Sequence, residues 1–431
     1  MPYANVLVPA DITAARRRRL QARLAGAGAL FAAGRAPERT PTIAYAFRPD
    51  SDFFYLTGLR EPEAVLWVGR EATVAFVRPR DRAAEGWTGR RLGVEEAPAA
   101  LGVDAAYPLD ELVDRLPELA KGHEALCYGV GGALDAAVLP LVAGAAGPAT
   151  LVHPRAVLHG LRLVKSEEEI AALRAAAAAT AAGFAAAVAA IAPGSTERRV
   201  RAALEHGFLA RGADGPAYGS IVATGANATV LHHQDEGAPL EAGQLLLIDA
   251  GAEVGCYACD VSRTYPVSGA FTPLQRQVVD LVLRAQAAAL DALVPGAVAD
   301  AYHARADLAL AEGLVALGVL QGEPAALVAA GRHKPYTRHR AGHFLGLDTH
   351  DVGGAMAAVT LAPGMVLTVE PGLYFAPDDE AIPAALRGLG VRIEDVALIT
   401  VEGATWLTDA IPREPLPDGR GSDACRRNRD R

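Results

Sequence analysis

The chain has 431 residues, more than the roughly 100 to 200 of a typical domain, so two or three folding units are expected. Its formal net charge is −9 at pH 7. This balance argues against nucleic acid as the main partner, because nucleic-acid binding usually requires a basic face. The arginine run from Arg16 to Arg19 is interpreted as the solvated face of a helix capped by Thr13.

Neither a membrane partner nor a secretory leader is expected. The alanine-rich stretch 175–192 carries no charge, but Ile170 and Leu173 begin an apolar pattern at helical spacing, typical of a helix packed against a core. The first fifteen residues lack the apolar core of a signal peptide, which predicts a cytoplasmic location. Cys256 and Cys259 form a C-x-x-C pair. A redox or zinc role is an alternative for them, although residues three apart on a strand point to opposite faces.

Composition shifts along the chain predict two domains and a tail. Residues 1–157 have the mixed helix and strand pattern of a smaller domain, with a hairpin over 63–77. Residues 158–412 form the second domain, and the boundary is expected near 159–165. The end of the chain, 413–431, is rich in glycine, proline and charge and is expected to be disordered.

Two helix starts divide the second domain. Ser166 and Glu169 have the spacing of a capping box, in which each side chain satisfies a free amide of the first turn. Thr272 and Pro273 are typical of a second helix start. In both places further helix and then strands follow, which predicts two similar α+β halves.

Two aspartates lie within an apolar stretch, LLLIDAGAEVGCYACDVSRTYPV, at residues 245–267. A hairpin turning at Val254 and Gly255 would place Asp249 opposite Asp260, with Cβ atoms about 5 Å apart. Bare carboxylates at that distance repel, and their burial costs several kcal/mol each. Either a shared proton or metal cations must lie between them, and two ions roughly 3.5 to 4 Å apart would fit.

Acids and histidines further along the chain favour the metal alternative. Glu370 ends the apolar strand in GMVLTVEPGLYF, while Glu394 lies within GVRIEDVALIT with Arg392 on the same face and Asp395 on the other. The glycines of RHRAGHFLGLDTHDVGG place its histidines on strand or loop. Four carboxylates would offset the charge of two divalent cations. Oxygen ligands with one imidazole favour manganese, with cobalt and zinc as alternatives.

Five motifs in order over residues 160 to 411 resemble the "pita-bread" metallopeptidases, a family that includes methionine aminopeptidases, prolidases, Xaa-Pro aminopeptidases and the metal-free creatinases. The motifs are IDAG with Asp249, DVSRTYP with Asp260, HFLGLDTHD with His343 and His350, TVEPG with Glu370, and RIED with Arg392 and Glu394. RPDSDFFYLTGLREPEAVL and EGWTGRRLG, earlier in the chain, resemble the N-terminal domain of Xaa-Pro aminopeptidases. The resemblance therefore implies an α+β pita-bread catalytic domain preceded by a smaller, mixed α/β creatinase-type domain.

The resemblance also implies two divalent metal ions, manganese before cobalt or zinc. Asp249 and Asp260 would hold the first ion, and Asp260 would also reach the second. His343 and Glu370 would complete the second site, and Glu394 would bridge the two ions. A hydroxide between the ions would be the nucleophile.

Other residues would act around the metals. His232, in NATVLHH, matches the substrate-side histidine of the family; His350 would donate a hydrogen bond to the developing oxyanion, and Glu370 would relay a proton to the leaving nitrogen. His339 matches a residue near the proline pocket, and Arg392 would hold ligand carboxylates. Two positions depart from the family: His233 stands where tyrosine is frequent, and Cys259 stands where a small residue is common.

The implied function is a dinuclear-metal aminopeptidase that hydrolyses the N-terminal Xaa-Pro bond of peptides. The expected partners are peptides with proline second and further copies of the chain, as a dimer or tetramer. A prolidase, which acts on Xaa-Pro dipeptides, is the close alternative. A non-catalytic peptide-binding scaffold is a third hypothesis, since a fold alone does not establish activity.

Overall fold

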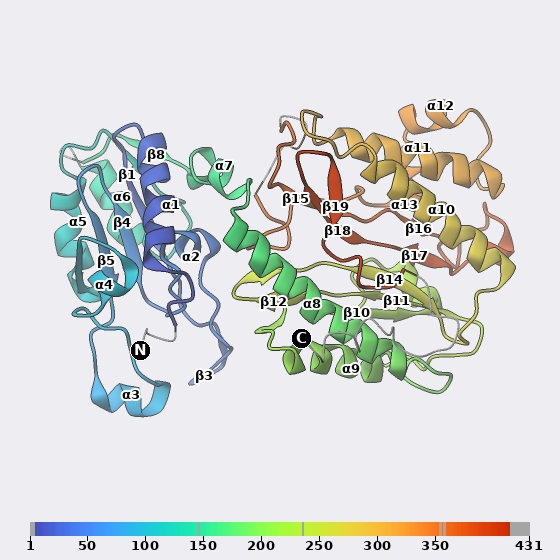
Figure 1. The fold of residues 1–431 in the computed structure, drawn as a ribbon, viewed down its shortest axis with the longest axis horizontal. Helices are drawn as coiled ribbons and strands as arrows, with labels where there is room; N and C mark the ends of the chain where they lie inside the picture. Colours follow the sequence, from blue (N-terminus) through green and yellow to red (C-terminus); the bar gives the residue numbers. More distant parts are fainter. Residues whose placement is uncertain (1–4, 145–146, 235–236, 353–355, 357–358, 414–431) are drawn as a thin grey trace. The chain divides into compact units, whose positions relative to one another are not determined.

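The structure is a computed structural model, and it describes residues 5–144, 147–234, 237–352, 356 and 359–413. By internal contacts the chain divides into two compact units, Met1–Arg162 and Leu163–Arg431, described separately below (Figure 1). The sequence-based division at 157/158 stands five residues before this one. The predicted disordered tail lies outside the described residues from residue 414 onward.

The first unit is built on a mixed six-stranded sheet in the order β6-β5-β4-β1-β7-β8. Its strands are β1 (Gly28–Ala32), β4 (Val65–Val68), β5 (Thr73–Val77), β6 (Ala105–Pro108), β7 (Ala125–Cys127) and β8 (Thr150–Val152). A separate small hairpin pairs β2 (Glu38–Thr40) with β3 (Ile43–Ala44). The antiparallel pairing of β4 with β5 confirms the hairpin predicted over 63–77.

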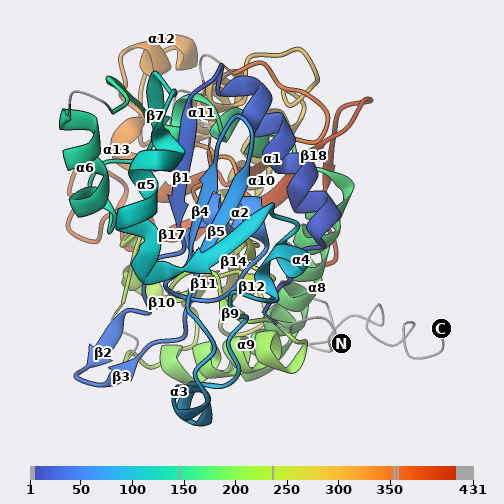
Figure 2. The same cartoon turned by 90° about the vertical axis from the view of Figure 1, so that its left-hand side faces the viewer.

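The described part of this unit has seven helices, some of which lie on either face of the sheet (Figure 1). They are α1 (Ala10–Arg23), α2 (Ser51–Thr57), α3 (Arg82–Thr88), α4 (Ala97–Leu101), α5 (Leu112–Ala120), α6 (Asp135–Ala143) and α7 (His159–Arg162). Alternate strand residues such as Leu30 and Trp67 pack under α5 and α6 in one core. Figure 2 shows the strands between α5 and α1.

The arginine run at the start of the chain differs from its prediction. Thr13 is buried inside α1 and bonds to the carbonyl of Ala10, so it does not cap the helix. Arg16 and Arg17 are buried and donate to backbone carbonyls, including that of Leu56 at 2.7 Å from Arg17. The solvated face was therefore the wrong interpretation for these two side chains. They satisfy carbonyls at the ends of α2 and α4, a role that requires long donors.

The second unit consists of two helix pairs with strands between them (Figure 1). The first half contains α8 (Glu167–Ala190), α9 (Glu197–Ala210) and a sheet of β10 (Ile221–Thr224), β11 (Leu245–Asp249) and β14 (Ser262–Pro266). The second half contains α10 (Pro273–Leu290), α11 (Ala301–Ala316) and a sheet of β15 (Val366–Val369), β18 (Asp395–Ile399) and β19 (Ala404–Trp406). The prediction of two similar α+β halves is confirmed.

Short elements complete the unit. They are β9 (Gly215–Pro216), β12 (Ala252–Val254) and β13 (Tyr257–Ala258) in one small sheet, β16 (Gly372–Tyr374) paired with β17 (Gly390–Arg392), and the helices α12 (Pro324–Ala329) and α13 (Lys334–Thr337). The 3-10 turns are η1 (Leu109–Glu111), η2 (Pro154–Ala156), η3 (Gly225–Thr229) and η5 (Ala384–Leu386).

Both predicted helix starts are present. The Glu169 carboxylate accepts from the backbone N–H of Ser166 at 3.0 Å, and the Thr272 hydroxyl accepts from the backbone N–H of Gln275 at 3.3 Å. The helix α8 is long and apolar enough to cross a membrane, but half of its most apolar 18-residue stretch is buried inside the protein. It packs closely along α9, where a Cβ on Gly183 would lie 2.2 Å from the Phe208 ring.

Candidate metal centre

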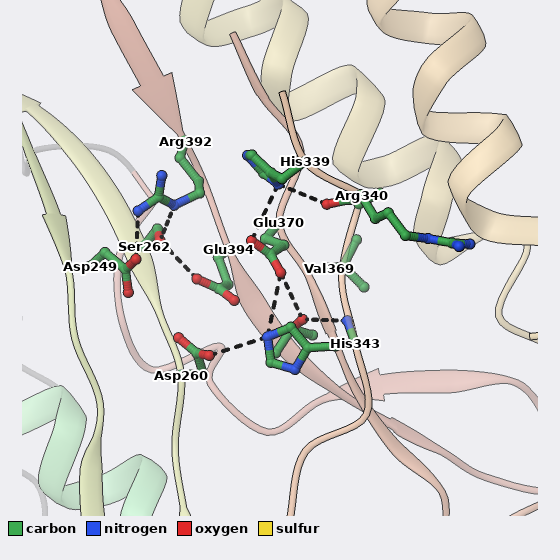
Figure 3. A network of polar contacts seen from close by, with 12 residues as sticks. Asp249, Asp260, Ser262, His339, Arg340, His343, Val369, Glu370, Arg392 and Glu394 are labelled. Carbon is green, nitrogen blue, oxygen red and sulfur yellow. Dashed lines mark hydrogen bonds and ion pairs between the residues drawn. The ribbon is translucent and has the colours of Figure 1, made fainter. Parts of the chain in front are cut away.

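Four carboxylates from separate strand ends converge in the second unit (Figure 3). Asp249 ends β11, Glu370 follows β15 directly, and Glu394 lies between β17 and β18. Asp260 lies just before β14. Strand ends suit such a site because the neighbouring ladders fix the backbone while the side chains project beyond them.

The hairpin that carries the two aspartates has a different register from the predicted one. Asp249 pairs with Ser262, and Glu253 pairs with Ala258, so the turn lies at Gly255 and Cys256. Both turn residues have positive φ, 57° and 67°, as a tight two-residue hairpin requires. The prediction of directly opposed aspartates was therefore wrong by two positions. A shift of two conserves the face, because side chains alternate with a period of two.

Tyr218 joins the two aspartates and was missed by the sequence analysis. Its hydroxyl donates to Asp249 Oδ1 at 2.6 Å and also contacts Asp260 Oδ1. Burial raises the pKa of Tyr218 well above its usual value, and both carboxylates add to the rise. The signal available was weak: a tyrosine in the glycine- and proline-containing PAYGS segment before an apolar strand.

His343 lies beside the strand that leads into Glu370 and faces Asp260 across the cluster (Figure 3). Its Nε2 lies 3.5 Å from Asp260 Oδ2 and 3.5 Å from Glu370 Oε1 (Figure 3). Ligand atoms of Asp260, His343 and Glu394 all lie within 4.8 Å of one another. Nδ1 of His343 donates to the carbonyl of Phe344 at 3.0 Å, which directs Nε2 into the cluster.

Arg392 supports the cluster from behind. It donates from Nη2 to Asp249 Oδ2 at 2.5 Å and from Nε to Ser262 Oγ at 2.8 Å. The Ser262 hydroxyl in turn donates to Glu394 Oε2 at 2.7 Å. Asp395, next in sequence, points away and accepts from the fully buried Arg263 at 2.7 Å. The predicted separation of the adjacent acids onto opposite faces is thus observed.

His339 and Tyr374 extend this network toward Glu370. Burial lowers the pKa of His339 to about 4, so its ring is neutral at pH 7. Because its Nδ1 lies 2.7 Å from the carbonyl of Arg340, that nitrogen carries the proton, and Nε2 accepts from the Tyr374 hydroxyl at 2.6 Å. Tyr374 accepts from Arg392 Nη1 at 2.8 Å. His339 Nδ1 also lies 3.5 Å from Glu370 Oε2.

Two more predicted histidines lie at the edge of the cluster. The ring of His350 meets that of His343 edge to face, with 4.4 Å between centroids. Burial lowers the pKa of His350, and the neighbouring imidazoles of His343 and His232 add to this effect. His232 is exposed and close enough to influence both His350 and His339 electrostatically.

Burial and mutual repulsion raise the pKa values of three of the acids. Burial raises the pKa of Glu370 to about 7 against the opposing charge of His343, and Asp260 adds to the rise. Burial also raises the pKa of Glu394 well above its usual value, with contributions from the other three carboxylates. For Asp249, burial outweighs the lowering effect of Arg392. Cations would relieve this mutual repulsion.

The donor set fits divalent metal ions. Four carboxylates and one imidazole are the ligands that manganese-like ions accept, and each donor is held by a neighbouring hydrogen bond or ion pair. Among the described residues, neither thiol of the C-x-x-C pair joins this group of ligand atoms: Cys256 occupies the hairpin turn, and burial raises the pKa of Cys259 to about 12.

Comparisons with known proteins agree with this geometry. A model of metallopeptidase family M24 matches residues 171–401, and a model of the aminopeptidase P N-terminal domain matches residues 13–128. The chain is 39% identical over 407 residues to an Xaa-Pro aminopeptidase of Escherichia coli (strain K12), covering 90% of this chain and 92% of that protein. It is 36% identical to Xaa-Pro aminopeptidase 1 of Streptomyces coelicolor, over 93% of this chain and 84% of that one.

Solved structures give the same result. Zinc-substituted aminopeptidase P from E. coli, in complex with product, superposes with a TM-score of 0.90 at 39% identity, over 95% of this chain and 97% of that one. Proline aminopeptidase P II from Yersinia pestis superposes with a TM-score of 0.89 at 40% identity, over 95% of this chain and 98% of that one.

A buried cluster of acids with one histidine, set between two α+β halves, is the arrangement expected of a metallopeptidase. The chain belongs to metallopeptidase family M24 and carries an N-terminal domain of the aminopeptidase P type. The resemblance inferred from the sequence, to Xaa-Pro aminopeptidases with a pita-bread catalytic domain, is confirmed.

Proposed function

We propose that the protein removes the first residue from peptides whose second residue is proline. The single observation that carries the proposal is the convergence of Asp249, Asp260, His343, Glu370 and Glu394 in one buried cluster of an M24 chain. The named relatives, which are Xaa-Pro aminopeptidases matched over most of their length, support the substrate class.

The five side chains of this cluster would hold two divalent cations, manganese by preference with cobalt or zinc as alternatives. Such ions, when bound, lower the pKa of water toward neutrality and polarise a carbonyl group. Within the cluster, Arg392 and Tyr218 hold Asp249 between them. They therefore fix the direction in which its carboxylate faces the site.

The chain's own residues would handle the proton and the oxyanion. Glu370, whose carboxylate lies 3.5 Å from His343 Nε2, would accept a proton and pass it to the proline nitrogen, a leaving group that must be protonated. His350, beside His343, would donate to the oxygen on which charge develops. His232 would contact the substrate, and His339 would line the proline side of the site.

Two alternatives remain distinct hypotheses. A prolidase would use the same cluster but act on Xaa-Pro dipeptides. A binding scaffold would not need all five ligand residues, and each of them is present in the described cluster. The expected assembly as a dimer or tetramer and the cytoplasmic location stay predictions from the sequence.

The deciding experiment compares an Xaa-Pro-Yaa tripeptide with its Xaa-Pro dipeptide, each with manganese and with chelator. We expect metal-dependent release of the first residue from the tripeptide. Hydrolysis of the dipeptide alone would replace the proposal with a prolidase. No hydrolysis of either peptide, with no divalent ion retained by the purified protein, would favour the scaffold.

A further inference from the structure

The segment that carries His232 is held by one buried carboxylate. Glu197, in the first turn of α9, has no exposed surface. Its Oε1 accepts from the backbone N–H of Thr224 at 2.8 Å and from Asn227 Nδ2 at 2.9 Å. Its Oε2 lies 3.2 Å from His233 Nε2, and because a carboxylate can only accept, this nitrogen carries a proton. A single side chain thus fixes both ends of the stretch 224–233.

His232 and His233 are adjacent in sequence but face different surroundings. His233 is 9% exposed and turned inward to Glu197, whereas His232 is exposed and near enough to His339 and His350 to affect both electrostatically. Between β10 and His232 the chain follows the 3-10 turn η3, where no strand partner holds it in the described residues. Arg338 contributes a further contact, 2.8 Å from Nη1 to the carbonyl of Thr229. The inward anchor at His233 therefore determines where the next side chain upstream can reach.

We propose that Glu197 and His233 are positioning residues that act through His232, holding it at the place where it meets the peptide. The inference rests on the function proposed above. Loss of the His233 donor leaves Glu197 with one unsatisfied oxygen and frees the backbone beside His232. Displacement of a substrate-contacting group by about 1 Å can reduce turnover about 100-fold. Loss of the His233 donor is therefore expected to lower turnover more than an ordinary substitution in the core would.

The test is a double-mutant cycle on Xaa-Pro-Yaa hydrolysis with manganese. His233→Phe fills the volume but removes the donor, His232→Ala removes the substrate-side group, and a third variant carries both changes. We expect His233→Phe to lower kcat/KM about 10- to 100-fold. The double variant should be no slower than His232→Ala alone, because two residues that act as one unit are not additive. His233→Tyr restores a donor toward Glu197 and should recover most of the activity.

A structural role alone would give a different pattern. Losses that multiply in the double variant, or a His233→Phe variant as active as wild type, would overturn the proposal. Glu205→Gln, which alters a partly buried ion pair with Arg201 on the same helix, is the matched control and should leave kinetics unchanged. If His233→Phe does not fold, Asn227→Ala removes another donor of Glu197 and takes its place in the cycle.

Amide hydrogen exchange separates this inference from the proposed function. In His233→Phe the amides of 225–231 should exchange faster than in wild type, while those of α10 stay unchanged. This readout requires no substrate. If the wild-type protein hydrolysed no Xaa-Pro peptide, the proposed function would fail, but faster exchange would still support the anchor and unchanged exchange would reject it.

Discussion

Arg392 donates from Nη2 to the carboxylate of Asp249 at 2.5 Å (Figure 3). The Nε of Arg392 donates to Ser262, and the Ser262 hydroxyl in turn donates to Glu394 at 2.7 Å. One guanidinium therefore orients two of the four acids, one directly and one through a serine. Its planar fork makes this possible, because it places several donors in fixed directions. The arrangement links the first α+β half, which supplies Asp249, to the second, which supplies Arg392.

Arg392→Lys should lower manganese affinity or turnover about 10- to 100-fold, the usual cost of losing a partner that orients metal ligands. Lysine keeps the charge but cannot contact Asp249, Ser262 and Tyr374 together. Calorimetric metal titration and peptide kinetics measure the two quantities. Arg387→Lys, at a guanidinium that donates only to backbone carbonyls in the described contacts, is the control. Wild-type affinity and kinetics in Arg392→Lys would show that the network has no such role.

Asp260→Asn should reduce turnover by at least about 100-fold, since a ligand itself matters at least as much as the groups behind it. The variant should stay folded, because asparagine preserves the volume and can still contact Tyr218. Circular dichroism, metal analysis and peptide kinetics test these points together. Asp280→Asn changes a half-exposed acid on α10 that pairs with Arg276, and it should behave as wild type. Full turnover in Asp260→Asn with unchanged metal content would remove Asp260 from the ligand set.

Local chemistry made part of this fold predictable. The capping pairs at Ser166 and Thr272 act over three residues, so sequence alone located both helix starts. The hairpin register depended instead on which residues accept positive φ. Gly255 was an obvious candidate, but Cys256 at φ 67° was not, and the predicted turn was displaced accordingly.

Hydrogen bonds between residues far apart in the sequence were harder to predict. Arg16 and Arg17 find carbonyls some 40 and 85 residues away, which no local pattern reveals. Tyr218 likewise meets Asp249, 31 residues away, through the pairing of β10 with β11. Ser262 was within reach of sequence reasoning, because it lies two residues from Asp260 and so shares its face. Tertiary contacts that depend on completed sheets decide the remaining partners.

The effect of Glu394→Gln on the melting temperature should have opposite signs in the metal-free and the metal-loaded protein. Burial and the other carboxylates raise the pKa of Glu394 above its usual 4.5, so the metal-free folded state binds more protons than the unfolded chain. Its stability contribution therefore falls as pH rises above about 4.5. Glu394→Gln removes the free-energy cost of this buried acid at neutral pH. At pH 7 in chelator the variant should therefore melt above wild type, by about 2–4 °C for each kcal/mol gained.

With saturating manganese the order should invert, because wild type then gains binding energy that Glu394→Gln lacks. Thermal melts of both proteins, with chelator and with metal, provide the four required values. Asp280→Asn is again the control and should show no inversion. A Glu394→Gln variant that melts below wild type in both conditions would contradict the view that these acids repel one another without cations.

His303 should make the protein sensitive to mild acid. It is buried in α11, where its Nδ1 accepts from the backbone N–H of Ala341 at 3.1 Å, and burial lowers its pKa from 6.5 to about 4. Between these values the unfolded chain binds a proton that the folded protein does not, so stability is lost as pH falls from 6.5 toward 4. The loss amounts to at most about 3 kcal/mol. His303→Gln keeps an acceptor for Ala341 but cannot titrate, so its melting temperature should fall less than that of wild type over this range. Parallel slopes for the two proteins would mean that other groups control the acid response.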